Sequence, residues 1–545
     1  MSGLASESRS LGTLAGTGKL VRLILRRDRV LMPLWVVLLG VVPLSYVATI
    51  DELFPDAAGR AGYATTSAHN AGFVALYGPL FGSSLGELVA WRAGFLPVVV
   101  GLVSILTVIR HTRTEEDTGR RELLGSAVLG RHAPLAAALV ATCAANLVLA
   151  LVLAGGMVGQ DLPGAGSLAF GLELAASGWI FAGVGAVAAQ LTSAAGSARG
   201  IAVTTLGVAY VLRVVGDISG MSDGPLTWLT WLSPIGWAQR IRPYGDDAMW
   251  PVLLVVVGSV LLAPAAVALS ARRDVGAGLL PPRPGPAEGS AALRSPLALA
   301  WRLHRGLLAG WVGGFAALGV VLGYLAEGVG DLVGDNQELR DVFLRMGGAT
   351  GLMNSYLAGI LGILGIIAGA YAIQAMLRAR AEEVGGRVEP VLGTAVGRLH
   401  WVGSHLAFSL LGPAAALAAG GAAAGLTHGL NTRDVGAELP SLLGGALVQL
   451  PAVWVLATVA VLLFGLLPRY AAVAWAALAM CLLLSLVGSA VGLDQWMLDI
   501  SPFTHLPKLP GAAMAATPLV WLVGVSVVLA AVGLAGFRRR DVPVT

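Results

Sequence analysis

Apolar residues along this chain form long blocks that are separated by short polar segments. Each block contains roughly 18 to 25 residues, which is enough for an α-helix to cross the ~30 Å hydrocarbon core of a membrane. A membrane β-barrel would show shorter segments in which apolar and polar residues alternate. The pattern therefore predicts an all-α, polytopic membrane protein with about twelve transmembrane helices. Their expected centres are Val36, Val99, Leu147, Phe181, Leu206, Val257, Ala317, Ile363, Ala416, Leu456, Leu478 and Val525.

The composition also indicates an integral membrane protein. Hydrophobic residues make up 56% of the chain and charged residues only 12%, whereas soluble domains contain about 25% charged residues. The mean hydropathy is +0.79. Most of the charge lies between the apolar blocks, where its sign can indicate topology.

Basic residues gather on one side of the twelve-span count and acidic residues on the other. Because Lys and Arg are retained in cytoplasmic loops, the basic side is predicted to face the cytoplasm and to carry both termini of a plasma-membrane protein. The basic side contains Lys19, Arg22, Arg26, Arg27, Arg29, residues 110–132, Arg199, Arg272, Arg273, residues 380–398, Arg469 and residues 538–540. The acidic side contains Asp51, Glu52, Asp56, Asp217, Asp223, Asp246, Asp247, Asp331, Asp335, Glu338 and Asp341. The net charge of +4 follows from this topology and does not indicate nucleic-acid binding.

A charged segment after the second span occurs again after the eighth. "RTEEDTGRRELL" begins at Arg113 and "RAEEVGGRVEPV" begins at Arg380, a separation of 267 residues (380 − 113). The same separation, within one residue, relates "SP" at Ser233 to "SP" at Ser501 and "RRDV" at Arg272 to "RRDV" at Arg539. Three matching segments in one order predict an internal duplication.

Each copy would contain six spans, and an even number returns the second copy to the orientation of the first. The chain is therefore predicted to consist of two parallel six-helix halves, residues 1–275 and 297–545. Residues 276–296, "GAGLLPPRPGPAEGSAALRSP", are rich in proline and predict an extended cytoplasmic linker between them.

Within each charged segment a glutamate precedes an arginine by four residues, Glu116 before Arg120 and Glu383 before Arg387. This spacing predicts a short interfacial helix with an ion pair on its surface. Gly119 and Gly386 would allow a tight turn. A solvated loop that obeys the positive-inside rule is the simpler alternative, but that rule does not require repeated glutamates and glycine. The duplication favours a docking surface.

"EEDTGRRELL" resembles the cytoplasmic coupling segment of type-2 ABC exporter permeases. "EEVGGRVEPVL" resembles it too, with Pro390 in place of a leucine, so the second copy could dock less symmetrically. "WLSPIGW" and "DISPFTH" resemble the extracellular re-entrant segment of that family. The resemblance implies two six-span permease units in one chain, similar to the fused actinobacterial exporters of polyketide antibiotics and other drugs.

The resemblance further implies that a separate ABC ATPase subunit, in two copies, docks on both segments and binds ATP and Mg. The nearest match to a phosphate-binding loop in this chain is "GTLAGTGKL", where Thr13 and Leu20 occupy positions that the motif reserves for Gly and Ser/Thr. We therefore expect no cofactor and no ATPase activity in this chain. The implied ATPase-coupling residues are Arg113, Glu115, Glu116, Gly119, Arg120, Glu122, Arg380, Glu382, Glu383, Gly386, Arg387 and Glu389.

Four residues in predicted spans are candidates for the path of a small hydrophobic or amphiphilic substrate: Glu173, Trp179, Arg213 and Asp217. A charge at the bilayer centre costs about 2.5 to 3.5 kcal/mol on insertion scales, so such groups pair or face a cavity. Arg213 and Asp217 could alternatively pair with each other near the outer surface. A proton-coupled antiporter is the alternative function, with Glu173 and Asp217 as protonatable groups, but it leaves the repeated segment unexplained.

No catalytic or metal site is predicted. "GSSLG" at Ser84 and "GMSDG" at Ser222 match the nucleophile-elbow pattern, but neither follows a predicted strand. The eight histidines lack the paired spacing of metal ligands.

Overall fold

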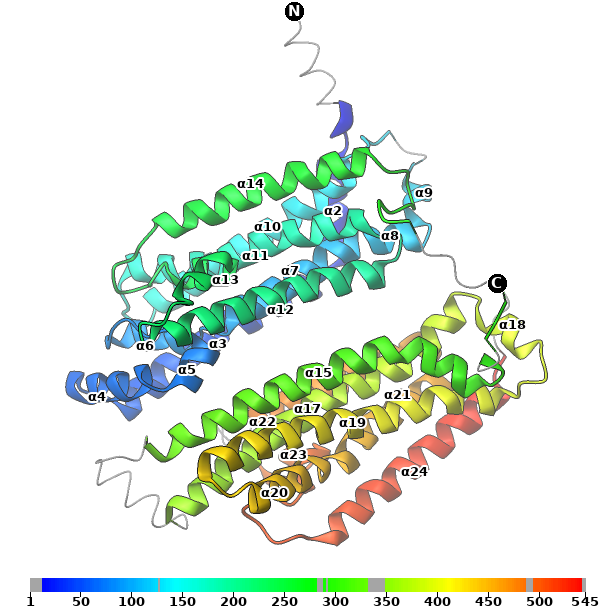
Figure 1. The fold of residues 1–545 in the computed structure, drawn as a ribbon. Coiled ribbons are helices and arrows are strands. Elements are labelled where there is room, and N and C mark those ends of the chain that lie inside the picture. The colour runs from blue at the N-terminus through cyan, green and yellow to red at the C-terminus, as the bar shows by residue number, and fades with distance from the viewer. Residues whose placement is uncertain are drawn as a thin grey trace, which may run out of the picture. The chain divides into compact units, whose positions relative to one another are not determined.

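The structure is a computed structural model that describes residues 12–125, 128–281, 288–290, 293–331, 348–486 and 494–541. These residues form helices and loops with no strand among them (Figure 1). The predicted all-α class is therefore confirmed. Linker residues Pro282, Pro284 and Pro286 and the predicted acidic loop residues Asp335, Glu338 and Asp341 lie outside the described residues.

The chain divides into two compact units, Met1–Gly285 and Pro286–Thr545. The division falls inside the segment 276–296 that was predicted as a linker. Unit 1 contains α2 Thr17–Arg27, α3 Leu31–Leu53, α4 Ala57–Ala68, α5 Ala71–Tyr77, α6 Leu85–Arg92, α7 Leu96–His111, α8 Arg113–Asp117, α9 Arg120–Gly125, α10 Ala133–Val158, α11 Gly164–Leu191, α12 Ala195–Gly220, the 3₁₀ helix η1 Thr227–Leu232, α13 Pro234–Gln239 and α14 Trp250–Ala271.

Unit 2 has a related order of helices. It contains α15 Pro296–Asp331, α17 Gly348–Val384, α18 Val388–Leu392, α19 Arg398–Thr432, α20 Val435–Leu447, α21 Leu450–Leu466, η3 Pro468–Val473, α22 Ala474–Leu486, α23 Gln495–Leu498, η4 Pro502–His505 and α24 Ala516–Arg539.

Twelve helical stretches within the described residues are long and apolar enough to cross a membrane. Every predicted span centre falls inside one of them, so the predicted count and positions are confirmed. Three stretches join adjacent helices: α7 continues into α8, α20 continues into α21, and η3 continues into α22. The protein is therefore a multi-pass membrane protein.

The interior of each unit is built around one helix that several others surround. In unit 1 this helix is α11, which packs against α7, α10, α12 and α14. Small residues let the backbones approach: a Cβ on Gly171 would lie 2.4 Å from the carbonyl oxygen of Ala150 in α10. In unit 2, α19 packs against α15, α17 and α20. A Cβ on Gly319 of α15 would lie 2.2 Å from the carbonyl oxygen of Gly420.

The repeated "SP" segments begin a short helix in both units. Ser233 is the N-cap of α13 and accepts a hydrogen bond from the backbone N–H of Gly236 at 3.3 Å. Ser501 is the N-cap of η4 and accepts one from the N–H of Phe503 at 3.4 Å. In each case proline is the first residue of the helix. A backbone N–H at this position would have no partner within the helix, so proline costs no hydrogen bond there.

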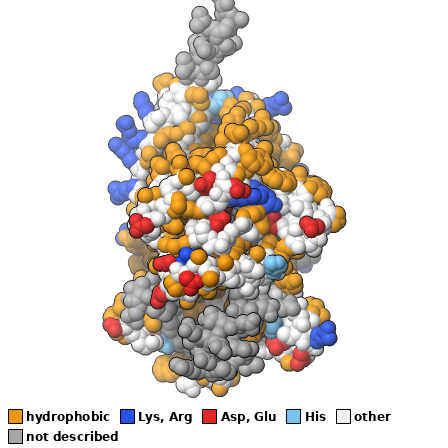
Figure 2. All heavy atoms as spheres, turned by 90° about the vertical axis from the view of Figure 1, so that its left-hand side faces the viewer, with side chains coloured by type: hydrophobic (Ala, Val, Ile, Leu, Met, Phe, Trp, Pro, Cys, Tyr) orange, Lys and Arg blue, Asp and Glu red, His pale blue; other side chains and the backbone are white. Residues whose placement is uncertain are grey.

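The two ends of unit 1 differ in their contents. At one end α8 and α9 lie beside the C-terminal end of α14, and at the other end lie α4, α5, α6 and α13 (Figure 1). Figure 2 looks onto the second end and shows acidic side chains exposed among apolar ones. The charged segment and the acidic loops are thus separated by the length of the transmembrane helices.

Candidate coupling site

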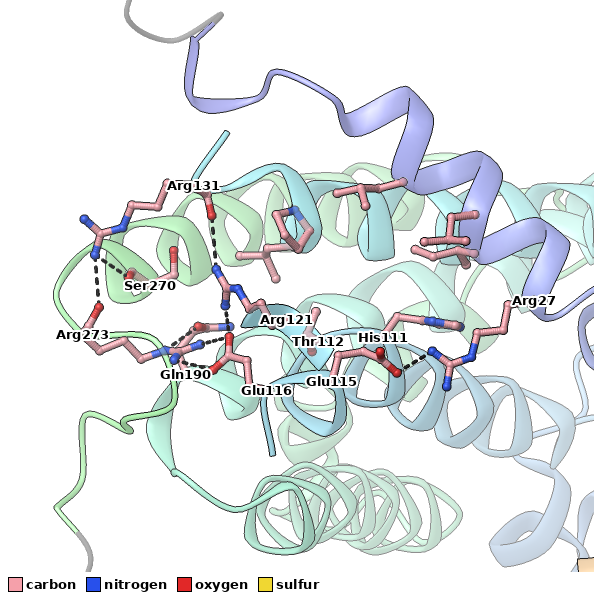
Figure 3. A pocket seen from close by; sticks show the side chains of 15 residues that line it. Arg27, His111, Thr112, Glu115, Glu116, Arg121, Arg131, Gln190, Ser270 and Arg273 are labelled. Carbon is pink, nitrogen blue, oxygen red and sulfur yellow. Dashed lines mark hydrogen bonds and ion pairs between the residues drawn. The ribbon is translucent and has the colours of Figure 1, made fainter. Parts of the chain in front are cut away.

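Glu116 is the centre of a buried ion cluster at the end of unit 1. Its side chain is 2% exposed, and three arginines donate to its carboxylate, two from the same charged segment and one from the loop after α14. Arg273 binds it with two nitrogens, at 2.7 Å and 2.9 Å. Arg121 donates to the same carboxylate (Figure 3). Arg113 donates to it as well. Burial is tolerated because the carboxylate is fully paired.

The arginines of this cluster also bind the ends of two transmembrane helices. Arg113 donates to the carbonyl oxygens of Thr192, after α11, and of Ala277, after α14, each at 2.5 Å. Arg273 donates from Nε to Oε1 of Gln190 in α11 at 2.9 Å. The charged segment is therefore fixed to the ends of the fourth and sixth spans.

The same cluster recurs in unit 2 at positions that are 267 residues later. Glu383, whose side chain is fully buried, accepts hydrogen bonds from Arg540 at 2.6 Å and 2.8 Å. Arg380 completes the cluster at 3.3 Å. We call the two clusters the clamps: Arg113, Glu116 and Arg273 in unit 1, and Arg380, Glu383 and Arg540 in unit 2.

The other glutamate of each segment pairs with the arginine that follows the glycine. Glu382 binds Arg387 at 2.6 Å and Arg378 at 2.9 Å. Glu115 lies 3.6 Å from Arg120 and 2.5 Å from Arg27 of α2.

The predicted pairing of Glu116 with Arg120, and of Glu383 with Arg387, is wrong. Gly119 and Gly386 have φ angles of +69° and +68°, so the chain leaves the helix at both positions. The next arginine is then no longer one helical turn beyond the second glutamate and reaches the first one instead. The predicted glycine turns are confirmed.

The predicted short interfacial helix is only partly correct. In unit 1 the segment forms two short helices, α8 and α9, on either side of Gly119. In unit 2, Glu382 and Glu383 belong to the long transmembrane helix α17, and only α18 follows the turn. Pro390 lies near the start of α18, where a missing N–H does not break a helical hydrogen bond.

Arg273 and Arg540 were not among the predicted coupling residues. A signal for them was present, because both belong to the "RRDV" repeat at the same 267-residue separation as the glutamates.

The pKa values of several arginines in and near the clamps are shifted. Burial lowers the pKa of the Arg273 guanidinium. Burial and the positive charge of Arg273 lower the pKa of Arg121. The hydrogen bond to Glu382 raises the pKa of Arg387. All three side chains remain cationic at neutral pH.

The predicted coupling residues divide into buried and exposed groups. Arg113, Glu116, Glu382 and Glu383 are buried, while Glu115 and Arg380 are partly exposed. The residues that are exposed and available to a partner are Arg120, Glu122, Arg387 and Glu389. Gly119 is exposed and Gly386 partly exposed at the turns. Each segment thus has a buried part that is bound to the transmembrane helices and an exposed part. We call the exposed residues, Arg120 and Glu122 in unit 1 and Arg387 and Glu389 in unit 2, the tips.

A cavity lies beside the unit 1 clamp. Figure 3 shows Glu115, Glu116, Arg121 and Arg273 around it, and the helix that closes one side is α2. Leu20, Leu23 and Ile24 of α2 supply an apolar wall. Movement of the charged segment would therefore change the packing of α2.

The candidate substrate-path residues fall into three places. Arg213 and Asp217 are buried and 3.7 Å apart, which agrees with the pairing alternative. Arg213 also donates to the carbonyl oxygens of Val74 and Ala75 at 2.8 Å and 2.7 Å. Asp217 also accepts from Thr230 at 2.9 Å and lies 3.4 Å from Arg240. This network joins α12 to α5, η1 and the end of α13.

Glu173 and Trp179 are not brought together. Glu173 lines a separate cavity near α6 and α13. Trp179 donates from Nε1 to the carbonyl oxygen of Cys143 in α10 at 3.1 Å. Trp454 makes the same contact in unit 2, with the carbonyl oxygen of Leu410 at 3.1 Å. Because both units contain this contact, we interpret Trp179 as a residue that joins two transmembrane helices.

Comparison with known proteins identifies the family. The chain is 44% identical over 529 residues to the multidrug efflux system permease protein Rv1217c of Mycobacterium tuberculosis, which covers 97% of this chain and 95% of that protein. The chain belongs to this permease family. Residues 293–538 also match the family model of the C-terminal domain of the multidrug efflux system permease Rv1217c. The family match lies within unit 2, and the longer alignment, over 529 residues, extends over both units.

Proposed function

We propose that this chain is the membrane permease of an ABC exporter that moves a hydrophobic or amphiphilic compound of the drug class out of the cell. ATP and Mg are bound by a separate ATPase subunit, two copies of which dock on the charged segments. Both termini and both segments face the cytoplasm in this proposal. The permease family and the positive-inside distribution of arginines support it.

The observation that carries the proposal is the repeated clamp. Glu116 and Glu383 lie at equivalent positions, and each is bound by an arginine that follows the last span of its unit. A solvated loop would carry only exposed ion pairs, each of which contributes about 0 to 1 kcal/mol. The buried carboxylate bound by two arginine nitrogens therefore indicates that the segment is held in a fixed position. The clamp makes each segment a rigid extension of the transmembrane helices.

Such an extension can transmit force in both directions. A partner that moves the exposed tip displaces the clamp, and the clamp is bonded to the ends of α11 and α14 in unit 1. Nucleotide binding to the ATPase would then shift the permease between inward-open and outward-open populations by binding one of them more tightly.

The test is retention of the ATPase by the purified full-length chain. The tips carry Glu122 and Glu389, which are exposed and form no ion pair among the described residues, so Glu122→Lys/Glu389→Lys reverses their charge without disturbing a clamp. Glu288→Lys is the control, because Glu288 is exposed in the segment between α14 and α15.

We expect wild type and Glu288→Lys to retain a co-expressed ABC ATPase subunit from the same organism on an affinity column, and the double tip variant to lose it. Equal retention by all three proteins would remove the tips from the docking surface. Absence of any ATPase partner of the wild type would contradict the proposed function.

A further inference from the structure

A second cavity in unit 1 lies at the end opposite the clamp. Its walls come from the loop after α5, from α6, from α11 and from the end of α13. The cavity volume is about 40 Å³, which is room for roughly three water-sized groups. This is the size of an ammonium head group, and the remainder of a larger molecule would extend out of the cavity.

Glu173 of α11 lines this cavity without any partner. Glu173 is 4% exposed, and its carboxylate forms no hydrogen bond or ion pair with the described residues. An unpaired charge at this depth is costly, so membrane proteins pair such groups or place them on a path for ions or substrates. A bound cation would supply the missing partner.

Gln239 offers a second unused acceptor in the same wall. Its Nε2 donates to the carbonyl oxygens of Tyr77 at 3.1 Å and Gly94 at 2.8 Å, and this pair of contacts fixes which end of the amide is the oxygen. Its buried Oε1 has no hydrogen-bond partner among the described residues. The wall therefore presents acceptors and lacks free donors at these two residues.

The net charge of the lining also favours a cation. Its charged members are Glu87, Glu173 and Arg242. Arg242 is already paired with Asp246 at 3.0 Å and lies 4.2 Å from the ring centroid of Phe81. Glu87 accepts a hydrogen bond from the backbone N–H of Ser84 at 3.0 Å and forms no ion pair within the part of the chain that the structure describes.

Aromatic rings complete the lining. Tyr77 and Trp91 meet edge to face with their centroids 5.1 Å apart, and Trp91 is fixed by its hydrogen bond to the carbonyl oxygen of Gly78 at 2.8 Å. Aromatic faces attract organic cations. Arg92 lies over the ring of Tyr77 and Arg242 over that of Phe81, so Trp91 is the lining ring that has no arginine over it among the described residues.

We propose that this cavity binds the positively charged amine head of an amphiphilic substrate, with Glu173 as its counter-ion. The site is specific to unit 1, because neither candidate counterpart of Glu173 carries a charge: Pro440 lies 267 positions later, and Val448 lies 275 positions later, the separation of Trp179 and Trp454. As a step in export this inference rests on the proposed function, whereas binding itself requires neither ATP nor the ATPase.

The test measures binding of tritiated benzylamine to the full-length chain in lipid nanodiscs without ATPase. At pH 7 this primary amine is protonated and offers N–H donors. Its neutral carbon isostere, ethylbenzene, is the control ligand. Wild type, Glu173→Gln, Glu173→Asp and Glu52→Gln are compared, because Glu52 is an exposed carboxylate outside the cavity.

We expect saturable binding to wild type and Glu52→Gln that the neutral isostere does not displace. Loss of a charge-assisted contact predicts an affinity for Glu173→Gln that is lower by about tenfold or more. Glu173→Asp keeps the charge and should retain more affinity than Glu173→Gln. Melting temperatures identify any variant that fails to fold.

Absence of saturable binding to wild type, or equal affinity in wild type and Glu173→Gln, would overturn this inference. Equal losses in Glu173→Asp and Glu173→Gln would overturn the counter-ion role. None of these results affects ATPase retention, so the exporter proposal would stand. Preserved cation binding with no ATPase partner would instead overturn the exporter proposal alone.

Discussion

Glu116 and Glu383 each receive one arginine from their own helix and another from the end of the last span in the same unit. A carboxylate buried in this way is stable only while its partners remain, because removing one leaves an under-compensated charge. The structural importance of the "RRDV" repeat therefore lies in its second arginine. The first arginine, Arg272 or Arg539, is exposed.

This difference between adjacent arginines gives a prediction with a built-in control. Arg273→Ala removes both nitrogens that bind Glu116, and we expect a loss of about 1.5 to 3 kcal/mol in stability. Arg540→Ala should cost at least as much, since Glu383 then keeps only Arg380. The measurement is the shift in thermal unfolding of the purified protein. Shifts as large in Arg272→Ala and Arg539→Ala would contradict the clamp.

At the level of elements, the glycine turn decides which glutamate meets which arginine. Helical spacing alone predicts Glu116 with Arg120, because the sequence pattern assumes that the helix continues. The left-handed conformation of Gly119 ends that helix and redirects Arg120 toward Glu115. The pairing within each clamp also depends on where the chain runs after the last span of the unit. This path cannot be predicted from the spacing of residues within the charged segment.

Gly119→Ala tests this turn. A Cβ at Gly119 would meet nothing within 4 Å, so the change introduces no clash and acts only through the φ angle of +69°. The left-handed conformation costs a residue with a Cβ roughly 1 to 2 kcal/mol. We expect reduced thermal stability and weaker ATPase retention.

Gly196→Ala is the control for that substitution. Gly196 also has open space around it but lies within helix α12, where alanine is favoured over glycine by about 0.5 to 1 kcal/mol. Stability should therefore stay the same or rise. A Gly119→Ala protein that behaves like Gly196→Ala would show that the turn tolerates a helical backbone.

At the scale of the whole molecule, the sequence was sufficient to predict the helical class and the position of every span. Spans are strongly determined because a membrane demands about 20 consecutive apolar residues, and this signal survives without any knowledge of packing. The duplication was visible because the charged segments could be aligned at one separation. The site was harder to predict, since Arg273, Gln239 and Glu87 act through contacts between distant segments.

Orientation can be tested by cysteine labelling. In a background with Cys143→Ala and Cys481→Ala, Thr65→Cys places an exposed thiol on α4, and Glu288→Cys places one in the loop between the units. A membrane-impermeant maleimide added to intact cells should label Thr65→Cys, and should label Glu288→Cys only after lysis. The reverse pattern would invert the proposed topology and move the charged segments outside.

The energy source is the most direct test of the exporter account. The chain is reconstituted in proteoliposomes with and without the ABC ATPase of the retention test. Transport of the organic cation benzyltrimethylammonium and of a neutral fluorescent drug is followed with ATP or with an imposed proton gradient. The account predicts transport of at least one compound that needs both ATP and the ATPase and that falls in Glu122→Lys/Glu389→Lys. Transport by the chain alone, driven by the proton gradient and unchanged in that variant, would contradict it and support an antiporter.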